Sequence, residues 1–311
     1  MSEVIRPVVL SKRTFVDNRV VFYDVCGDGS PVLFLHGWGL AQRSYRGALR
    51  GLAARGFQVI APAQPGFGGT PQLARRQFSL AGYARWLDGF CSAVELAEPA
   101  VVIGHSFGGG VAIRFAHDYA HRVRALMLVN SIGGTAWKQG KGLRTLAERP
   151  LWDWGLHFPA DIWPLPQATR VIPVMLEDAL PNAVRNPLSL VKVANLARRA
   201  DLTGELEELK RRGLPITVLW GRRDGIIPKE AFEEMCAAAG QPGTVVDGSH
   251  SWLLANPEHF AEVITNSLAV AKVAGAIEPP ADAPKRAGSR RRKPSAPAEL
   301  PTITGEQLPD A

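Results

Sequence analysis

The 311-residue chain is poor in cysteine and has no long apolar run. Its three cysteines, Cys26, Cys91 and Cys236, are an odd number at wide spacing, which excludes a disulfide framework and a cysteine zinc site and indicates reduced, partly buried thiols. Nowhere do about 18 apolar residues follow one another, and the N-terminus lacks the apolar stretch of a signal peptide. These absences predict a cytoplasmic protein without stable membrane insertion.

The basic residues are not concentrated in one segment, although the formal net charge is +7 and the isoelectric point is near 9.6. The excess is spread as single arginines between acidic residues, with no basic stripe interleaved with aromatic side chains. A solvated basic surface is therefore favoured over nucleic-acid binding. No H-E-x-x-H metal motif is present and no G-x-G-x-x-G motif follows the first strand, so we expect neither a metal nor an organic cofactor.

Short apolar runs alternate with helix-length segments, which is typical of a mostly parallel sheet with crossover helices. Helical periodicity is clear over residues 80–97, and a last helix is expected over 257–272. The runs that predict strands are residues 20–25, 32–35, 57–61, 101–105, 125–129, 215–220 and 244–247.

Two stretches interrupt this alternation. Residues 131–213 contain four tryptophans and many prolines but no strand pattern, and we interpret them as a helical cap inserted into a core of residues 1–130 and 214–274. Residues 275–311 are rich in Pro, Ala and charge and cannot bury enough apolar surface to become ordered. We predict that they form a disordered basic tail.

The most specific motif is GHSFG at residues 104–108, which matches G-x-S-x-G between an apolar run and a helical pattern. It predicts a nucleophile elbow, a tight strand-to-helix turn that admits only small residues two positions before and after the serine. Ser106 would then sit at a helix N-terminus, where backbone N–H groups and the helix dipole favour a developing negative charge. An incidental serine in a glycine-rich turn is disfavoured by the strand and helix around it.

A second glycine-rich turn, His36-Gly37-Trp38-Gly39, follows an earlier predicted strand. An oxyanion hole needs two N–H groups aimed at one point, and we assign them to Trp38 and Phe107. The His36 ring is expected to brace this turn and not to take part in catalysis. A base and an acid should follow at the ends of later strands, where His250 and Asp224 lie.

From about residue 20 to 272 the sequence resembles the α/β-hydrolase superfamily, specifically its capped, cofactor-free esterases and related hydrolases. The resemblance implies an α/β fold with a mostly parallel, eight-stranded sheet flanked by helices. Ala63 departs from it, because many relatives carry an aspartate there, and this affects how the loop beside the oxyanion turn is braced. The matching residues are 36–39, 65–68, 104–109, 221–224 with Pro228, and 248–250.

Two other residues lie near the same end of the predicted sheet and could be proposed as the acid. Some hydrolases of this fold place the acid one strand earlier, but here that strand ends in Asn130, which cannot carry the charge that stabilises an imidazolium. Asp247 is only three residues before His250 and would need a tight backward turn to reach the ring. Asp224 is therefore preferred.

A serine nucleophile argues against the epoxide hydrolase and haloalkane dehalogenase branches, which form an ester on a carboxylate. We predict a serine esterase of the carboxylesterase or lipase type that acts on a small-molecule apolar ester. The natural substrate, the acyl chain length and the oligomeric state stay undetermined. The predicted pocket residues are Trp154, Trp163, Ile227 and Trp252.

Two alternatives remain open at this point. Another reaction of the same triad is one: thioester hydrolysis, perhydrolysis or carbon–carbon hydrolysis of diketone acids. A carbon–carbon hydrolase could hold its substrate carboxylate with Asn195, Arg198 or Arg199. A non-catalytic, ligand-binding relative is the other alternative, although all three triad residues are present.

Overall fold

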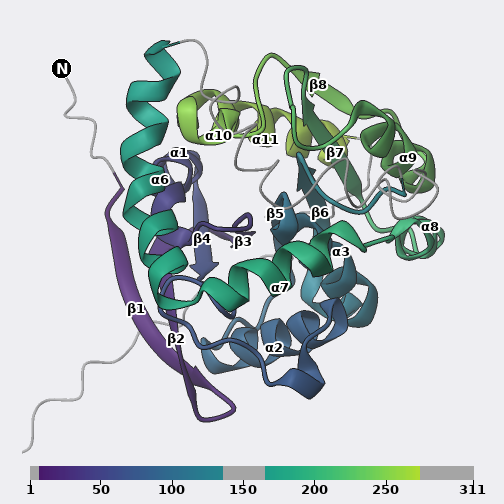
Figure 1. Ribbon diagram of the computed structural model, residues 1–311. Helices are drawn as coiled ribbons and strands as arrows, with labels where there is room; N and C mark the ends of the chain where they lie inside the picture. The colour runs from purple at the N-terminus through teal and green to yellow at the C-terminus, as the bar shows by residue number, and fades with distance from the viewer. Residues whose placement is uncertain (1–6, 136–164, 274–311) are drawn as a thin grey trace, which may run out of the picture. The chain divides into compact units, whose positions relative to one another are not determined.

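The computed structural model describes residues 7–135 and 165–273, and eight strands in them form one mixed sheet (Figure 1). The strand order is β1-β2-β4-β3-β5-β6-β7-β8; β1 with β2 and β2 with β4 are antiparallel, and the remaining pairs are parallel. The strands are β1 (Val9–Val16), β2 (Arg19–Cys26), β3 (Ser30–Leu35), β4 (Phe57–Pro62), β5 (Ala100–His105), β6 (Val123–Val129), β7 (Ile216–Gly221) and β8 (Thr244–Val246).

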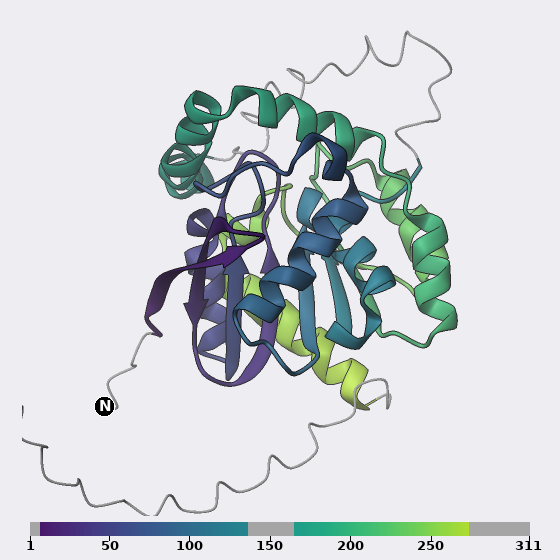
Figure 2. The same ribbon diagram turned by 90° about the horizontal axis from the view of Figure 1, so that it is seen from below.

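Helices cover both faces of this sheet (Figure 2). Side chains of α2, α3, α7, α8 and α9 pack in the hydrophobic core on one face, and those of α1, α10 and α11 pack in the core on the other. The helices are α1 (Arg46–Ala53), α2 (Leu80–Ala93), α3 (Phe107–Asp118), α6 (Leu165–Arg185), α7 (Pro187–Arg198), α8 (Thr203–Arg211), α9 (Lys229–Ala239), α10 (Trp252–Ala255) and α11 (Pro257–Val273), with the 3-10 turns η1 (Gln42–Tyr45), η2 (Arg75–Gln77) and η3 (Ala120–Arg122).

The predicted α/β-hydrolase architecture is confirmed, and the seven strands expected from apolar runs all form. The strand that the pattern did not predict is β1. Its sequence VLSKRTFV leaves most side chains exposed, because β1 is at the edge of the sheet and pairs only with β2. An edge strand with exposed Lys and Arg carries no apolar alternation by which it could be recognised.

Three helices, α6, α7 and α8, lie between β6 and β7 in the chain. Two of these helices pack in the same core as α3 and α9: α7 through Val193, Ala194 and Ala197, and α8 through Leu206 and Leu209. Helices α6 and α7 lie across one end of the strands in Figure 2. The predicted tail, residues 275–311, lies outside the described residues.

All three cysteines lie in the described part of the chain as free thiols; Cys26 and Cys91 are buried and Cys236 is half-buried. Burial raises the pKa of the Cys91 thiol to about 12. None of the described helices is long and apolar enough to cross a membrane. Because β3, β5, β6, β7 and β8 all run in the same direction, their carboxyl ends meet at one edge of the sheet, and the loops that leave this edge build the candidate site.

Candidate active site

Ser106 lies in the sharp turn between β5 and α3. Its φ of 53° and ψ of −118° fall in a region that residues with a Cβ rarely adopt, so surrounding contacts must hold it there. The Ser106 N–H donates to the carbonyl oxygen of Val129 on β6 at 3.0 Å, and the Ser106 carbonyl accepts from Gly109 and Ile132 at 3.0 and 3.2 Å. The sheet therefore stabilises a strained serine at the N-terminus of α3.

The two glycines of the motif are required by close backbone contacts. A Cβ added at Gly104 would lie 2.5 Å from the carbonyl oxygen of Gly108. A Cβ at Gly108 would lie 2.3 Å from the carbonyl oxygen of Leu35, at the end of β3. These distances explain physically why small residues were expected on both sides of the serine.

His250 and Asp224 come from the loops after β8 and β7 and meet through their side chains. His250 Nδ1 lies 2.9 Å from Asp224 Oδ2, and neither side chain is more than 7% exposed. Asp224 Oδ1 accepts from the N–H groups of Ile226 and Ile227 at 2.7 and 2.9 Å, and Oδ2 also accepts from Asn130 Nδ2 at 2.5 Å. A carboxylate held on both oxygens in this way orients the ring, and a neutral His250 that donates Nδ1–H to it keeps Nε2 as a proton acceptor.

Asp247 takes a different position from Asp224. Its side chain is 74% exposed and forms an ion pair with Arg223 Nη1 at 2.9 Å. Of the two carboxylates weighed from the sequence, the structure brings Asp224 against the His250 ring.

Asn130 and Trp252 support Asp224, a role that the sequence analysis did not assign to them. Asn130 directly follows β6 with a φ of 46°, donates its side-chain amide to Asp224, and accepts from Trp252 Nε1 at 2.8 Å. The left-handed backbone tolerated by asparagine turns this side chain toward the next loop. The available signal was a polar residue directly after a buried strand at the edge where Asp224 was expected.

The turn of residues 36–39 is tied to the His250 loop by a chain of buried hydrogen bonds. His105 Nε2 lies 3.1 Å from the carbonyl oxygen of His250, which can only accept, so Nε2 carries the proton and Nδ1 is an acceptor. Tyr45 donates its hydroxyl to this Nδ1 at 2.8 Å, and its oxygen accepts from the Gly37 N–H at 3.0 Å. Burial, reinforced by the neighbouring His250, lowers the pKa of His105 well below its usual value, and burial raises that of Tyr45, so both stay neutral.

His36 braces the same turn. Its Nε2 accepts from the Gln64 N–H at 2.9 Å, its Nδ1 lies 2.9 Å from the Gly37 carbonyl oxygen, and burial lowers its pKa to about 4. Gln64 Nε2 donates to the His36 carbonyl oxygen at 2.6 Å. Next to Ala63, where an aspartate was expected, it is therefore Gln64 that fixes this loop.

A cavity opens over Ser106 and His250, and two of the predicted pocket residues are not part of its described lining. Ile227 is 1% exposed and packs in the core, and Trp252 is 3% exposed and packs in the core on the opposite face, so their neighbours Ile226 and Ser251 line the cavity instead. Trp154 and Trp163 lie outside the described residues. The described lining consists of Gly37, Trp38, Leu40, Tyr45, His105, Ser106, Ile226, His250 and Ser251.

The two predicted oxyanion donors belong to elements that adjoin Ser106. Phe107 is the first residue of α3, where an N–H has no acceptor within the helix, and its ring packs edge-on against Tyr83 at 5.2 Å. Trp38 follows Gly37, at which an added Cβ would lie 3.3 Å from Ser106 Cβ, and Trp38 Nε1 donates to the Leu190 carbonyl oxygen of α7 at 2.8 Å. The turn and the first residue of α3 are therefore both next to Ser106, and the assignment of the two N–H groups to an oxyanion hole stays a prediction.

A model of the alpha/beta hydrolase family matches residues 32–263 of the chain. The chain belongs to the alpha/beta hydrolase family. It is 29% identical over 258 residues to a protein of Mycobacterium phage D29 provisionally named a non-heme haloperoxidase, covering 81% of this chain and 92% of the relative. It is also 29% identical over 258 residues to a pimeloyl-[acyl-carrier protein] methyl ester esterase of Aromatoleum aromaticum, covering 75% and 96% of the two chains. Among solved structures, an esterase from Exiguobacterium antarcticum shares the fold with a TM-score of 0.65 at 18% identity, over 84% of this chain and 100% of that one.

The hydrolase presents a largely uncharged cavity. Within the described lining there is no Asp, Glu, Lys or Arg side chain, and the titratable groups are His105, His250 and Tyr45. Within residues 7–135 and 165–273, no cluster of three or more His, Cys, Asp or Glu side chains has the arrangement of a metal site. The polar side chains of this lining are those of Tyr45, His105, Ser106, His250 and Ser251.

Proposed function

We propose that this hydrolase cleaves carboxylic esters through an acyl-enzyme on Ser106. The observation that carries the proposal is that a strained Ser106 and His250 line one cavity, while Asp224 holds the far nitrogen of the His250 ring at 2.9 Å. Nucleophile, base and orienting acid each come from the end of a different strand, in the chain order of this fold.

In the proposed reaction, Ser106 Oγ attacks the ester carbonyl and His250 Nε2 takes its proton. The N–H groups of Phe107 and Trp38 stabilise the oxyanion of the tetrahedral intermediate. His250 then returns the proton to the leaving alcohol, which leaves an acyl group on Ser106. Water, deprotonated by His250, attacks the acyl carbonyl; the acid departs and Ser106 regains its proton.

The described cavity favours an uncharged acyl group. Leu40 and Ile226 supply apolar surface, and the indole of Trp38 is held beside them by α7. The 29% sequence identity to a methyl ester esterase, over most of both chains, supports the same reaction class for this chain.

A diketone-acid hydrolase is less well supported. Its substrate carboxylate would need a cation or amide, and the candidates Asn195, Arg198 and Arg199 are absent from the described lining. Arg198 Nη2 instead donates to Asn195 Oδ1 at 3.2 Å. Carbon–carbon hydrolysis is therefore the alternative, and a panel of substrates distinguishes it from ester hydrolysis.

The proposal is tested by labelling with a fluorophosphonate and by hydrolysis of aryl esters of graded chain length alongside a vinylogous diketone acid. We expect labelling and ester turnover in the wild type and the loss of both in Ser106→Ala. Ser251→Ala is the matched control, because Ser251 is a second buried serine in the same cavity and its replacement should leave the label on Ser106. Labelling that persists in Ser106→Ala, or turnover of the diketone acid alone, would overturn the proposal.

A further inference from the structure

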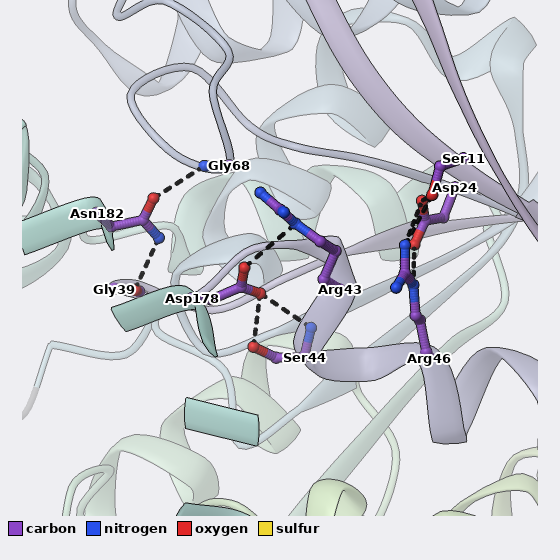
Figure 3. Close-up of polar contacts among 9 residues, drawn as sticks. All are labelled: Ser11, Asp24, Gly39, Arg43, Ser44, Arg46, Gly68, Asp178 and Asn182. Carbon is purple, nitrogen blue, oxygen red and sulfur yellow. Dashed lines mark hydrogen bonds and ion pairs between the residues drawn. The ribbon is translucent and has the colours of Figure 1, made fainter. Parts of the chain in front are cut away.

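Helix α6 contacts the core through two buried polar side chains on one face (Figure 3). Asp178 is 2% exposed and Asn182, one helical turn later, is 5% exposed. Buried polar groups are stabilised only when they are hydrogen-bonded, so their partners define where this helix sits.

Asp178 binds the 3-10 turn η1. Its Oδ2 accepts from the Ser44 N–H at 2.9 Å and from the Ser44 hydroxyl at 2.7 Å, and its Oδ1 lies 3.5 Å from Arg43 Nε. The next residue, Tyr45, ends η1 and accepts from the Gly37 N–H. Asp178 therefore holds the element that fixes the beginning of the oxyanion turn.

Asn182 binds the other end of that turn. Its Nδ2 donates to the Gly39 carbonyl oxygen at 3.0 Å, and its Oδ1 accepts from the Gly68 N–H at 3.0 Å. Figure 3 shows the Asn182 amide between these two loops, so one side chain of α6 joins the oxyanion turn to the loop after β4.

We propose that Asp178 and Asn182 are positioning residues through which α6 sets the geometry of the oxyanion turn. Gly37 is held through Tyr45 and η1, Gly39 is held directly, and the proposed donor Trp38 lies between them. This inference rests on the proposed function, because it gives the turn a part in stabilising the transition state.

A positioning role predicts a specific kinetic effect. Displacing one oxyanion donor weakens binding of the transition state more than binding of the ground state, so kcat should fall while KM changes little. If α6 merely docked on the core, its variants would lose stability without this division between kcat and KM.

Asn182→Asp tests the link to Gly39. The carboxylate has the same shape and still accepts from Gly68, but it has no N–H for the Gly39 carbonyl and repels it. We expect ester kcat and the rate at which a fluorophosphonate labels Ser106 to fall roughly 10- to 100-fold, less than for complete loss of an oxyanion donor. KM should stay within about threefold of the wild-type value.

Asp178→Asn is the second variant, and it keeps the test available if Asn182→Asp does not fold. An amide retains an acceptor for Ser44 but loses the ionic contact with Arg43, so we expect a smaller fall in both rates, about threefold to tenfold. Its effect should also appear in kcat and not in KM.

Asp24→Asn is the matched control, drawn in the same view (Figure 3). Asp24 is also fully buried, and it pairs with Arg46 at 2.8 Å and accepts from Ser11 at 2.7 Å. These partners belong to α1 and β1, so neither bond holds η1 or residues 37–39. This variant should lose thermal stability and still be labelled within about twofold of the wild-type rate.

The outcomes separate the two proposals. A wild-type protein that is not labelled at Ser106 rejects the proposed function, and the positioning role with it. A labelled wild type with Asn182→Asp and Asp178→Asn both labelled at its rate, or with Asp24→Asn slowed equally, rejects the positioning role alone. Slower labelling of the α6 variants, with KM unchanged and the control unaffected, supports both.

Discussion

Helices α3 and α6 both contact the segment of residues 35–39, but they are attached to the molecule in opposite ways. Helix α3 buries apolar side chains, among them Val111 and Phe115, and its Gly108 lies close to the Leu35 carbonyl oxygen. Helix α6 buries Asp178 and Asn182. Its aliphatic side chains Leu176, Leu180 and Val184 are 57%, 59% and 72% exposed.

The two kinds of contact have different effects: apolar burial stabilises the site, and hydrogen bonds set the geometry of its parts. Apolar burial is strong but has no direction, so α3 stabilises the sheet on which Ser106 is held. Hydrogen bonds contribute little net free energy, but they fix angles and distances, so α6 aligns a turn. Substitutions on the core side should therefore change stability or the chemical step most, and substitutions on the outer face of α6 should change neither.

The largest effect is expected at the acid on the core side. Asp224→Asn should lower kcat by about 10³ to 10⁴, as loss of the orienting carboxylate does in other triads. Asp247→Asn should be much milder, because the Asp247 side chain is 74% exposed and pairs with Arg223. Ester turnover of the two variants is compared under conditions in which both are folded to the same extent. If Asp247→Asn had the larger effect, Asp247 and not Asp224 would be the orienting acid.

An effect of intermediate size is expected of pH on the free energy of unfolding, because two neutral histidines are buried beside the oxyanion turn. Burial lowers the pKa of His36 from 6.5 to about 4, so the unfolded chain binds a proton between these values that the folded chain does not. Stability is then fully present above about pH 6.5 and is lost as pH falls toward 4, by up to about 1.4 kcal/mol per pH unit for one proton. The pKa of His105 is lowered in the same direction.

Urea unfolding at several pH values between 7 and 4.5 measures this loss for the wild type and for His36→Gln. The glutamine keeps an acceptor for the Gln64 N–H but does not titrate, so the variant should lose less stability on acidification. Parallel profiles for the two proteins would contradict a buried, neutral His36.

These contrasts also mark what the sequence could predict. The elbow, the turn at residues 36–39 and the loops with Asp224 and His250 were predictable, because backbone geometry forces glycine and because catalytic residues follow buried strands. Asn130 was dismissed as an acid and in the structure supports one, because its function depends on a left-handed φ that the sequence does not display. Ile227 and Trp252 pack in the two cores while their neighbours Ile226 and Ser251 line the cavity, and the sequence does not display which of two adjacent side chains faces a pocket.

The positions of Asp178 and Asn182 could not be predicted from the sequence for another reason. Their partners are 134 and 143 residues away in the chain, and a polar pair on a helix is ordinarily a solvent-exposed pair. The edge strand β1 could not be predicted either, because it depends on which neighbour the fold supplies and not on local periodicity.

The smallest effect is expected on the outer face of α6, and one substitution made on both helices tests it. Val111 on α3 is 0% exposed, so Val111→Ala should lower the free energy of unfolding by about 2 kcal/mol through lost burial and the space left behind. Val184 on α6 is 72% exposed, so Val184→Ala loses almost no burial. The better helix propensity of alanine should offset that small loss and leave stability within about 0.5 kcal/mol of the wild type.

Urea unfolding curves give the free energies of unfolding of Val111→Ala and Val184→Ala, and ester turnover of each folded variant is the second measurement. Equal destabilisation by both substitutions would mean that the aliphatic side of α6 is packed in solution and that this helix is held by apolar burial as α3 is. A neutral Val184→Ala beside a slowed Asn182→Asp would mean the opposite. Helix α6 would then act on the oxyanion turn through its polar face alone, which is the arrangement that its buried Asp178 and Asn182 predict.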